Sequence, residues 1–171
     1  MDLYLKHLAS PIGELHVYAT DRSVVGLFMG SRPFKGCRRP WQEAREADHA
    51  LLLETAGELD AYFAGRLRSF TVPVEVAGTD FQKAVWESLR TIAYGELRTY
   101  GDVARAIDRP AAVRAVGGAI GSNPVSIIIP CHRVIGSDDS LTGFGGGLPV
   151  KQRLLEMEGH AIAHLKLEPK R

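Results

Sequence analysis

Cysteine is scarce in this 171-residue chain, which contains only Cys37 and Cys131. Small secreted domains that depend on disulfides carry several cysteine pairs, so a disulfide framework is not expected. The two cysteines and six scattered histidines do not suggest a metal site, and Cys131 and His132 are too close in sequence for an ordinary pair of ligands. We therefore expect no metal and no cofactor.

Long apolar runs and a large net charge are also missing. No stretch is long enough to span a bilayer, and the first ten residues lack the apolar segment of a secretory signal, so we expect a cytoplasmic protein with no membrane contact. The net charge of +1 excludes a broadly basic surface, and any nucleic-acid-binding surface must be local. The length allows one domain or two small ones.

The first half predicts a small antiparallel sheet with one flanking helix. Apolar runs at Leu15–Ala19 and Val24–Met29 follow turn signals and indicate a hairpin. Residues 30–41 are rich in Gly, Pro and Arg and indicate a loop. Apolar residues then recur at helical spacing from about Glu46 to Ala64, and Gly65 stands where a C-terminal cap belongs.

A change of character at Gly78 marks the second half. The preceding extended stretch, Phe70–Val74, is either a last strand or a linker. Thr79 and Gln82 form a capping-box pattern at the start of an amphipathic helix, and Gly95 ends that segment.

Two short helices then predict a helix-turn-helix. Thr99 can cap the first, a break follows at Asp108–Arg109, and Pro110 is placed to start the second, which runs to about Ile120. Such pairs also occur in purely structural roles, so the pattern alone indicates DNA binding only weakly. Gly117–Gly118 in the second helix either permits close helix packing or lets the backbone approach a ligand such as DNA.

The segment around Cys131 carries the chemistry. Ile127–Ile129 is fully apolar and predicts a buried strand, which Pro130 stops. Most free cysteines are small buried hydrophobic residues, but the cationic neighbours of Cys131 favour a thiolate nucleophile. Adjacent residues of an extended chain point to opposite sides, so His132 is expected to reach the thiol through a water unless the chain turns there.

These residues resemble a known active-site signature. Pro130-Cys131-His132-Arg133-Val134 is similar to that of the O6-alkylguanine-DNA alkyltransferases, also called methylated-DNA–protein-cysteine methyltransferases. The resemblance covers almost all of residues 78–160 and extends through Gly78-Thr79-Asp80-Phe81-Gln82, Val85-Trp86, Ile92-x-Tyr94-Gly95-Glu96, Tyr100-Gly101, Ala111 to Gly118, Ser122-Asn123-Pro124 and Thr142 to Gly147, ending near Glu158-Gly159. The first half matches loosely, chiefly through Ser10-Pro11-Ile12-Gly13 and Tyr62-Phe63-x-Gly65.

The resemblance implies direct, single-turnover DNA repair with a role for each matched residue. Cys131 would accept the alkyl group of O6-alkylguanine, His132 would act as a base through water, and Glu158 would orient His132. Tyr100 would protonate N3 of the leaving guanine, and Arg114 would fill the gap left by the flipped base. Taken singly, Tyr100 could instead be a core aromatic, Arg114 a solvated helix residue and Glu158 a surface acid. Asn123 would hold the turn before the active-site strand.

The resemblance also implies the binding surfaces. DNA contacts would come from Arg114, Tyr100, Ala112, Gly117, Gly118 and Ser122, and the substrate pocket would include Ser126, Val134, Phe144 and Gly145. The helix-turn-helix would enter the minor groove and tolerate different sequences. The expected partner is double-stranded DNA containing O6-alkylguanine, with O4-alkylthymine as a further candidate lesion. The protein is expected to be a monomer, and cooperative assembly on DNA is left open.

Three departures from the family pattern concern substrate range and metal binding. Phe144 stands where many members carry tyrosine, and Ser126 stands where the animal enzymes carry proline. Both leave the substrate range and the response to bulky guanine inhibitors open. The zinc site in the N-terminal domain of some members has no matching ligands here.

The expected fold is an α+β protein of two parts and a tail. Residues 1–77 would form the sheet-plus-helix domain, 78–160 a mainly helical domain with the helix-turn-helix and the acceptor, and 161–171 a loose charged tail. Two other classes of protein stay open. A Cys-His hydrolase would turn over and need no helix-turn-helix, whereas a non-catalytic DNA-binding module would lack the acceptor cysteine.

Overall fold

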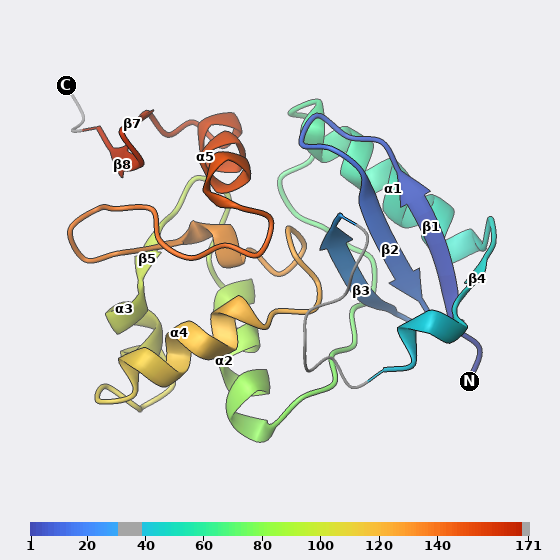
Figure 1. Cartoon of the computed structure of the whole chain (residues 1–171), viewed down its shortest axis with the longest axis horizontal. Helices are drawn as coiled ribbons and strands as arrows, with labels where there is room; N and C mark the ends of the chain where they lie inside the picture. The colour runs from blue at the N-terminus through green and yellow to red at the C-terminus, as the bar shows by residue number, and fades with distance from the viewer. Residues whose placement is uncertain (31–38, 169–171) are drawn as a thin grey trace. The chain divides into compact units, whose positions relative to one another are not determined.

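The computed structural model describes residues 1–30 and 39–168, so Cys37 lies outside the described residues. The chain forms two compact units: Met1–Gly78 with Pro124–Ile128, and Thr79–Asn123 with Ile129–Arg171. A sheet dominates the first and helices dominate the second, which confirms the predicted α+β class (Figure 1). Within the described ranges, no helix is both long and apolar enough to cross a membrane.

The first unit is built on a four-stranded sheet of order β3-β2-β1-β4. The two predicted strands are confirmed as β2 (Leu15–Ala19) and β3 (Val24–Met29), which pair antiparallel. The prediction missed β1 (Tyr4–Leu8), which carries polar Lys6 and His7 and therefore gives a weak strand signal; it pairs antiparallel with β2. The short β4 (Arg45–Glu46) adds to β1 in parallel.

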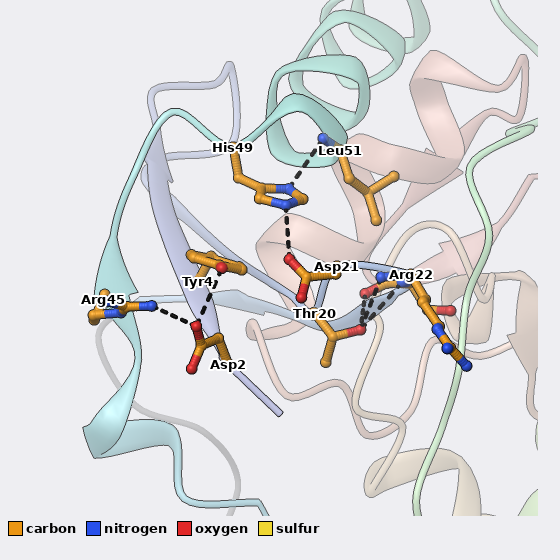
Figure 2. Close-up of polar contacts among 9 residues, drawn as sticks. Asp2, Tyr4, Thr20, Asp21, Arg22, Arg45, His49 and Leu51 are labelled. Carbon is orange, nitrogen blue, oxygen red and sulfur yellow. Dashed lines mark hydrogen bonds and ion pairs between the residues drawn. The ribbon is translucent and has the colours of Figure 1, made fainter.

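Helix α1 (Ala50–Phe63) packs against β1, β2 and β3. It begins at Ala50 rather than near Glu46, because Glu46 is held in β4 and His49 takes the N-cap position. Figure 2 shows His49 accepting a hydrogen bond from the Leu51 amide (3.3 Å) while its other ring nitrogen lies 3.2 Å from Asp21. After the helix, the predicted cap residue Gly65 has a φ of +75°.

Further along the first unit, Phe70–Val74 forms no strand. Val74 makes a single parallel bridge to Val24, and the Val24 amide donates to the Pro73 carbonyl at 2.8 Å. Of the two alternatives for this stretch, the linker fits, because one bridge does not make a ladder.

Three helices that pack on one another open the second unit: α2 (Asp80–Arg90), α3 (Tyr100–Ala106) and α4 (Val113–Gly121) (Figure 1). Both predicted caps are confirmed, since the side chain of Thr79 accepts from the Gln82 amide and that of Thr99 from the Asp102 amide, each at 3.1 Å.

The connection between α3 and α4 is longer than predicted. Helix α4 starts at Val113 and not at Pro110, because Asp108 adopts a left-handed conformation with a φ of 58° and the Ala112 amide donates to the Arg109 carbonyl at 2.9 Å. Residues 109–112 therefore form a turn, which separates the two helices of the helix-turn-helix.

The remaining elements are short. The 3-10 helix η2 (Cys131–Arg133) leads into β6 (Val134–Ile135), which pairs in parallel with β5 (Arg98–Thr99). Helix α5 (Leu148–Met157) is followed by a hairpin of β7 (Ile162–Ala163) and β8 (Lys166–Leu167).

The expectation of a loose tail is wrong for residues 161–168. Ile162 and Leu167 pack against a core cluster formed by Ile135, Leu141 and Leu155. The Leu141 amide donates to the Leu165 carbonyl at 2.7 Å. Two apolar residues thus hold the hairpin to the second unit despite the charged residues around them.

Candidate active site

The chain turns immediately before Cys131. The predicted strand at Ile127–Ile129 is absent: Ile127 has a φ of 71°, and the Ile128 amide bonds the Ser126 carbonyl at 2.8 Å. A β-branched residue rarely adopts this left-handed conformation. The three isoleucines are buried as expected, but their backbone forms a turn and not a paired strand.

Asn123 connects the end of α4 to the residues that precede Cys131. Its side chain is buried and its Nδ2 donates to the Ile129 carbonyl at 2.8 Å. It also hydrogen-bonds the Cys131 side chain. This is the position from which Asn123 was expected to hold the turn, and the amide contacts both the turn and the thiol-bearing residue.

Cys131, His132 and Arg133 occupy one tight turn, η2, instead of an extended segment. The Cys131 amide donates to the Ile129 carbonyl (2.8 Å) and the Arg133 amide to the Pro130 carbonyl (3.0 Å). All three side chains are buried. The two-sided arrangement expected of a strand therefore does not apply to this segment.

Glu158 lies at the centre of a buried polar network. One carboxylate oxygen is 2.6 Å from His132 Nε2, and the other accepts from Arg133 Nε at 2.7 Å. Arg133 makes a second bond to Glu158 through Nη2 (3.2 Å) and donates through Nη1 to the Ile92 carbonyl (2.7 Å). A forked guanidinium–carboxylate pair of this kind is strong and fixes orientation. Glu158 is thus a buried network residue and not a surface acid.

This network sets the tautomer of His132. Glu158 is the anion of an ion pair with Arg133, and a carboxylate can only accept hydrogen bonds. Nε2 of His132 must therefore carry the proton that Glu158 accepts. Nδ1 is buried and has no hydrogen-bond partner among the described residues. Burial lowers the pKa of His132 more than Glu158 raises it, so the ring is neutral at pH 7. His132 therefore presents Nδ1 as a free base.

Lys151 is a site residue that the sequence analysis missed. It is 1% exposed on α5, and Nζ donates to the carbonyls of Val134 (2.6 Å) and Thr142 (2.8 Å). The sequence does contain a pattern that indicates its burial. Lys151 stands three and four residues before Leu154 and Leu155, so it lies on the apolar face of the helix. Burial lowers the pKa of its ammonium to about 8, which still leaves most of it charged at pH 7.

Opposing effects act on the pKa of the Cys131 thiol. Burial raises the pKa of Cys131 above its ordinary value, while the Asn123 hydrogen bond and the charge of Lys151 oppose that increase. The thiol is consequently protonated in the resting protein, and a base is needed to make the nucleophile.

Tyr100 is joined to Lys151 through Thr142. The Tyr100 hydroxyl donates to the Thr142 carbonyl (3.3 Å), to which Lys151 also donates, and accepts from Thr142 Oγ1 (3.0 Å). Tyr100 is half-buried at the first position of α3. Its hydroxyl is therefore held at the surface of the second unit and not in a core.

The other expected residues fall into three groups. Arg114 and Gly118 are exposed on α4, and Ala112 and Ser122 are the N-cap and C-cap of that helix. Val134 follows η2 and offers its carbonyl to Lys151, and Phe144 and Gly145 lie in the loop before α5. Ser126 is buried in the first unit, where its amide donates to the Leu27 carbonyl at 3.2 Å.

A buried cysteine followed by a histidine that binds a glutamate, together with a helix-turn-helix, is typical of a DNA-modifying protein that uses a thiol as its nucleophile. Residues 80–160 match the family model of the 6-O-methylguanine DNA methyltransferase DNA binding domain, and residues 3–76 match that of the ribonuclease-like domain. The chain is 44% identical over 157 residues to a methylated-DNA–protein-cysteine methyltransferase of Haemophilus influenzae, covering 91% of this chain and 86% of the relative. It is 41% identical over 160 residues to one from Mycobacterium leprae, covering 94% of each.

Solved structures agree with the sequence matches. The crystal structure of Mycobacterium tuberculosis OGT in complex with DNA superposes with a TM-score of 0.82 at 42% identity, covering 91% of this chain and 92% of that one. The chain belongs to the 6-O-methylguanine DNA methyltransferase family.

Replacing Glu158 by Gln should destabilise the fold strongly, because Arg133 would lose its buried counter-charge. Breaking one partner of a buried ion pair typically costs about 3–5 kcal/mol. The free energy of unfolding from denaturant titration measures the loss. Glu156→Gln, an exposed change on α5, should stay within about 0.5 kcal/mol of the parent. Equal effects of the two changes would show that the network adds no stability.

Proposed function

We propose that this protein repairs alkylated DNA directly, by stoichiometric and irreversible transfer of the O6-alkyl group of guanine to Cys131. The observation that carries the proposal is the buried Cys131–His132–Arg133 turn, in which His132 and Arg133 both bind Glu158. The names of the relatives and the DNA-bound structure of one of them support the substrate class.

The chemical step is a displacement at the alkyl carbon. Nδ1 of His132 makes no hydrogen bond to the thiol although the chain turns here, so it takes the thiol proton through a bridging water, and the sulfur of Cys131 attacks the carbon. The new S–C bond forms as the bond between that carbon and guanine O6 breaks. The product is a thioether, which has no carbonyl for water to attack, so each molecule acts once. Glu158 stabilises the imidazolium that forms for part of this step.

The leaving guanine needs a proton to depart neutral. Tyr100 is the proposed donor to N3, since its hydroxyl stands at the start of α3 and is oriented by Thr142. Lys151, bound to the same carbonyl, keeps a positive charge beside the thiolate while the sulfur is ionised. Thr142 thus connects the proposed proton donor with the charge that assists the nucleophile.

Helix α4 is the proposed minor-groove element. A Cβ added to Gly118 would meet nothing within 4 Å, and one on Gly117 would make an ordinary 3.8 Å contact with the Tyr100 ring. Packing within the protein therefore does not require glycine at either position. This favours the alternative in which small residues let the backbone approach DNA closely, with Arg114 exposed beside them to replace the flipped base.

Several narrower points belong to the same proposal. The lesion is O6-alkylguanine in duplex DNA, with O4-alkylthymine as a second substrate to be tested, and binding is tolerant of sequence. The protein acts as a monomer. The proposed domains are residues 1–77 and 78–160, of which Pro124–Ile128 packs with the first unit.

A duplex carrying one radiolabelled O6-methylguanine tests the transfer. At most one label should move to each protein, and mass spectrometry should find it on Cys131. Cys131→Ala should abolish transfer while leaving DNA affinity within a few-fold, and Cys37→Ala should retain transfer. Label on Cys37 would contradict the assignment. Multiple turnovers would indicate the hydrolase, and binding without transfer would indicate a non-catalytic module.

Replacing His132 by Gln should slow transfer by about 10²- to 10⁴-fold at pH 7, the usual contribution of a positioned base. Burial raises the pKa of Cys131, so without the base the reaction depends on spontaneous ionisation of the thiol. The rate of the variant should therefore rise more steeply between pH 7 and 9 than that of the parent. Single-turnover rates across this range measure the effect, and parallel profiles would remove His132 from the proton transfer.

Arg114→Ala should slow repair of duplex DNA far more than transfer from free O6-benzylguanine. Holding a base out of the stack costs a few kcal/mol, so a duplex-specific defect of roughly tenfold or more is expected. Arg153→Ala, an exposed change on α5, serves as the matched control. Equal losses of Arg114→Ala on both substrates would assign Arg114 to folding or to the chemical step.

A further inference from the structure

Two histidines and a glutamate come together on one face of the sheet in the first unit. His7 of β1 and His16 of β2 are direct cross-strand partners, so their side chains share a face. Glu14 stands two residues before His16 and extends the same face. The rings of His7 and His16 meet edge to face, with centroids 4.4 Å apart.

The three side chains converge on a common point. Glu14 Oε1 lies 3.0 Å from His7 Nδ1 and 2.6 Å from His16 Nε2. One ligand atom from each residue can be chosen so that all three lie within 4.8 Å of one another. Zinc requires roughly 2.0–2.2 Å to each ligand atom, so the three side chains would rotate to hold an ion between them. The His7 and Glu14 side chains are 39% and 61% exposed, so an ion from solvent can reach them, whereas that of His16 is 6% exposed and anchors the site.

A fourth residue orients the first histidine. His7 Nε2 lies 2.9 Å from Glu46 Oε1 on β4, a strand that pairs with β1. When Nε2–H donates to this carboxylate, Nδ1 is left as a lone pair directed at the shared point. A carboxylate behind a ligating histidine is the usual way in which a protein fixes the ring and raises its basicity. The cluster thus contains three possible metal ligands and a carboxylate, Glu46, that orients one of them.

We propose that His7, Glu14 and His16 bind a divalent transition metal, Zn²⁺ foremost, with water completing a tetrahedral site. Two imidazoles and one carboxylate suit zinc, whereas Mg²⁺ and Ca²⁺ prefer all-oxygen sites. The bound ion would clamp β1 to β2 and, through Glu46, tie β4 to the same strand. All four residues belong to the first unit, so the site is independent of the Cys131 chemistry.

This proposal reverses the expectation that the chain has no metal site. The ligands stand at positions 7, 14 and 16, and only the register of β1 with β2 brings them together. The more familiar spacing, His160 and His164, would suit a helix, but both residues follow the end of α5. The competing interpretation is that protons, and no ion, bridge the imidazoles and carboxylates of His7, Glu14 and His16.

Isothermal titration of the metal-free, full-length protein with ZnCl₂ separates the two interpretations. One equivalent should bind, while MgCl₂ should not. His7→Gln and Glu14→Gln should each weaken zinc binding at least about tenfold, and Glu46→Gln about 10- to 100-fold. The matched controls His164→Gln and Glu54→Gln, both exposed and outside the cluster, should bind as the parent does. A Zn²⁺-induced rise in Tm should be present in the parent and controls and absent in His7→Gln and Glu14→Gln.

Co²⁺ provides a second readout that excludes the cysteines. Its absorption spectrum in the parent should show nitrogen and oxygen ligation without a thiolate charge-transfer band, and Cys131→Ser should leave the spectrum unchanged. Failure of the parent to bind Zn²⁺, binding that survives both His7→Gln and Glu14→Gln, or a thiolate band lost in Cys131→Ser would each overturn the proposal. If one variant unfolds, the other still decides.

Discussion

The buried ion pair between Arg133 and Glu158 is the interaction on which the site depends. Two charges removed from water are tolerated only when nearly every donor and lone pair is satisfied, and here the guanidinium also bonds the Ile92 carbonyl while the carboxylate also bonds His132. That arrangement fixes the turn after Cys131 to the end of α5. It also decides which nitrogen of His132 can act as a base, so one interaction serves both the fold and the proposed chemistry.

A second constraint is the desolvation of the thiol. A buried thiol resists ionisation, and the protein counters this with a hydrogen bond from Asn123 and the charge of Lys151. Neither interaction ionises the thiol permanently, and a neutral thiol reacts slowly with other electrophiles. This matters for a nucleophile that acts once, because a side reaction at the cysteine would inactivate the protein. In the proposed mechanism, Nδ1 of His132 takes the thiol proton once the alkylated guanine is bound.

Individual backbone carbonyls connect the helices of the second unit. The Thr142 carbonyl accepts from both Tyr100 on α3 and Lys151 on α5, so the proposed proton donor and the charge near the thiol are positioned together. Helix α4 is held to α2 by a bond from Trp86 Nε1 to the Ala119 carbonyl (2.8 Å), which leaves the face with Arg114 and Gly118 exposed. The helix that would meet DNA and the residues that would perform the transfer thus rest on the same scaffold.

The sequence by itself determined the class of fold, the family and the features set by neighbouring residues. Strands β2 and β3, the helix caps at Thr79 and Thr99, and the Pro-Cys-His-Arg-Val signature depend on the spacing of neighbouring residues, which can be read from the sequence alone. Tertiary structure alone decided the rest. The turn at Ile127, beside the bond from the Ser126 amide to Leu27, the missed strand β1 and the packed hairpin at residues 161–168 depend on partners distant in the chain. The late start of α4 comes instead from the left-handed conformation of Asp108, which the residue types around it did not indicate. The burial of Lys151 and the pairing of His7 with His16 are also set by residues distant in the chain. Burial and side-chain contacts depend on distances in space and not on positions in the sequence.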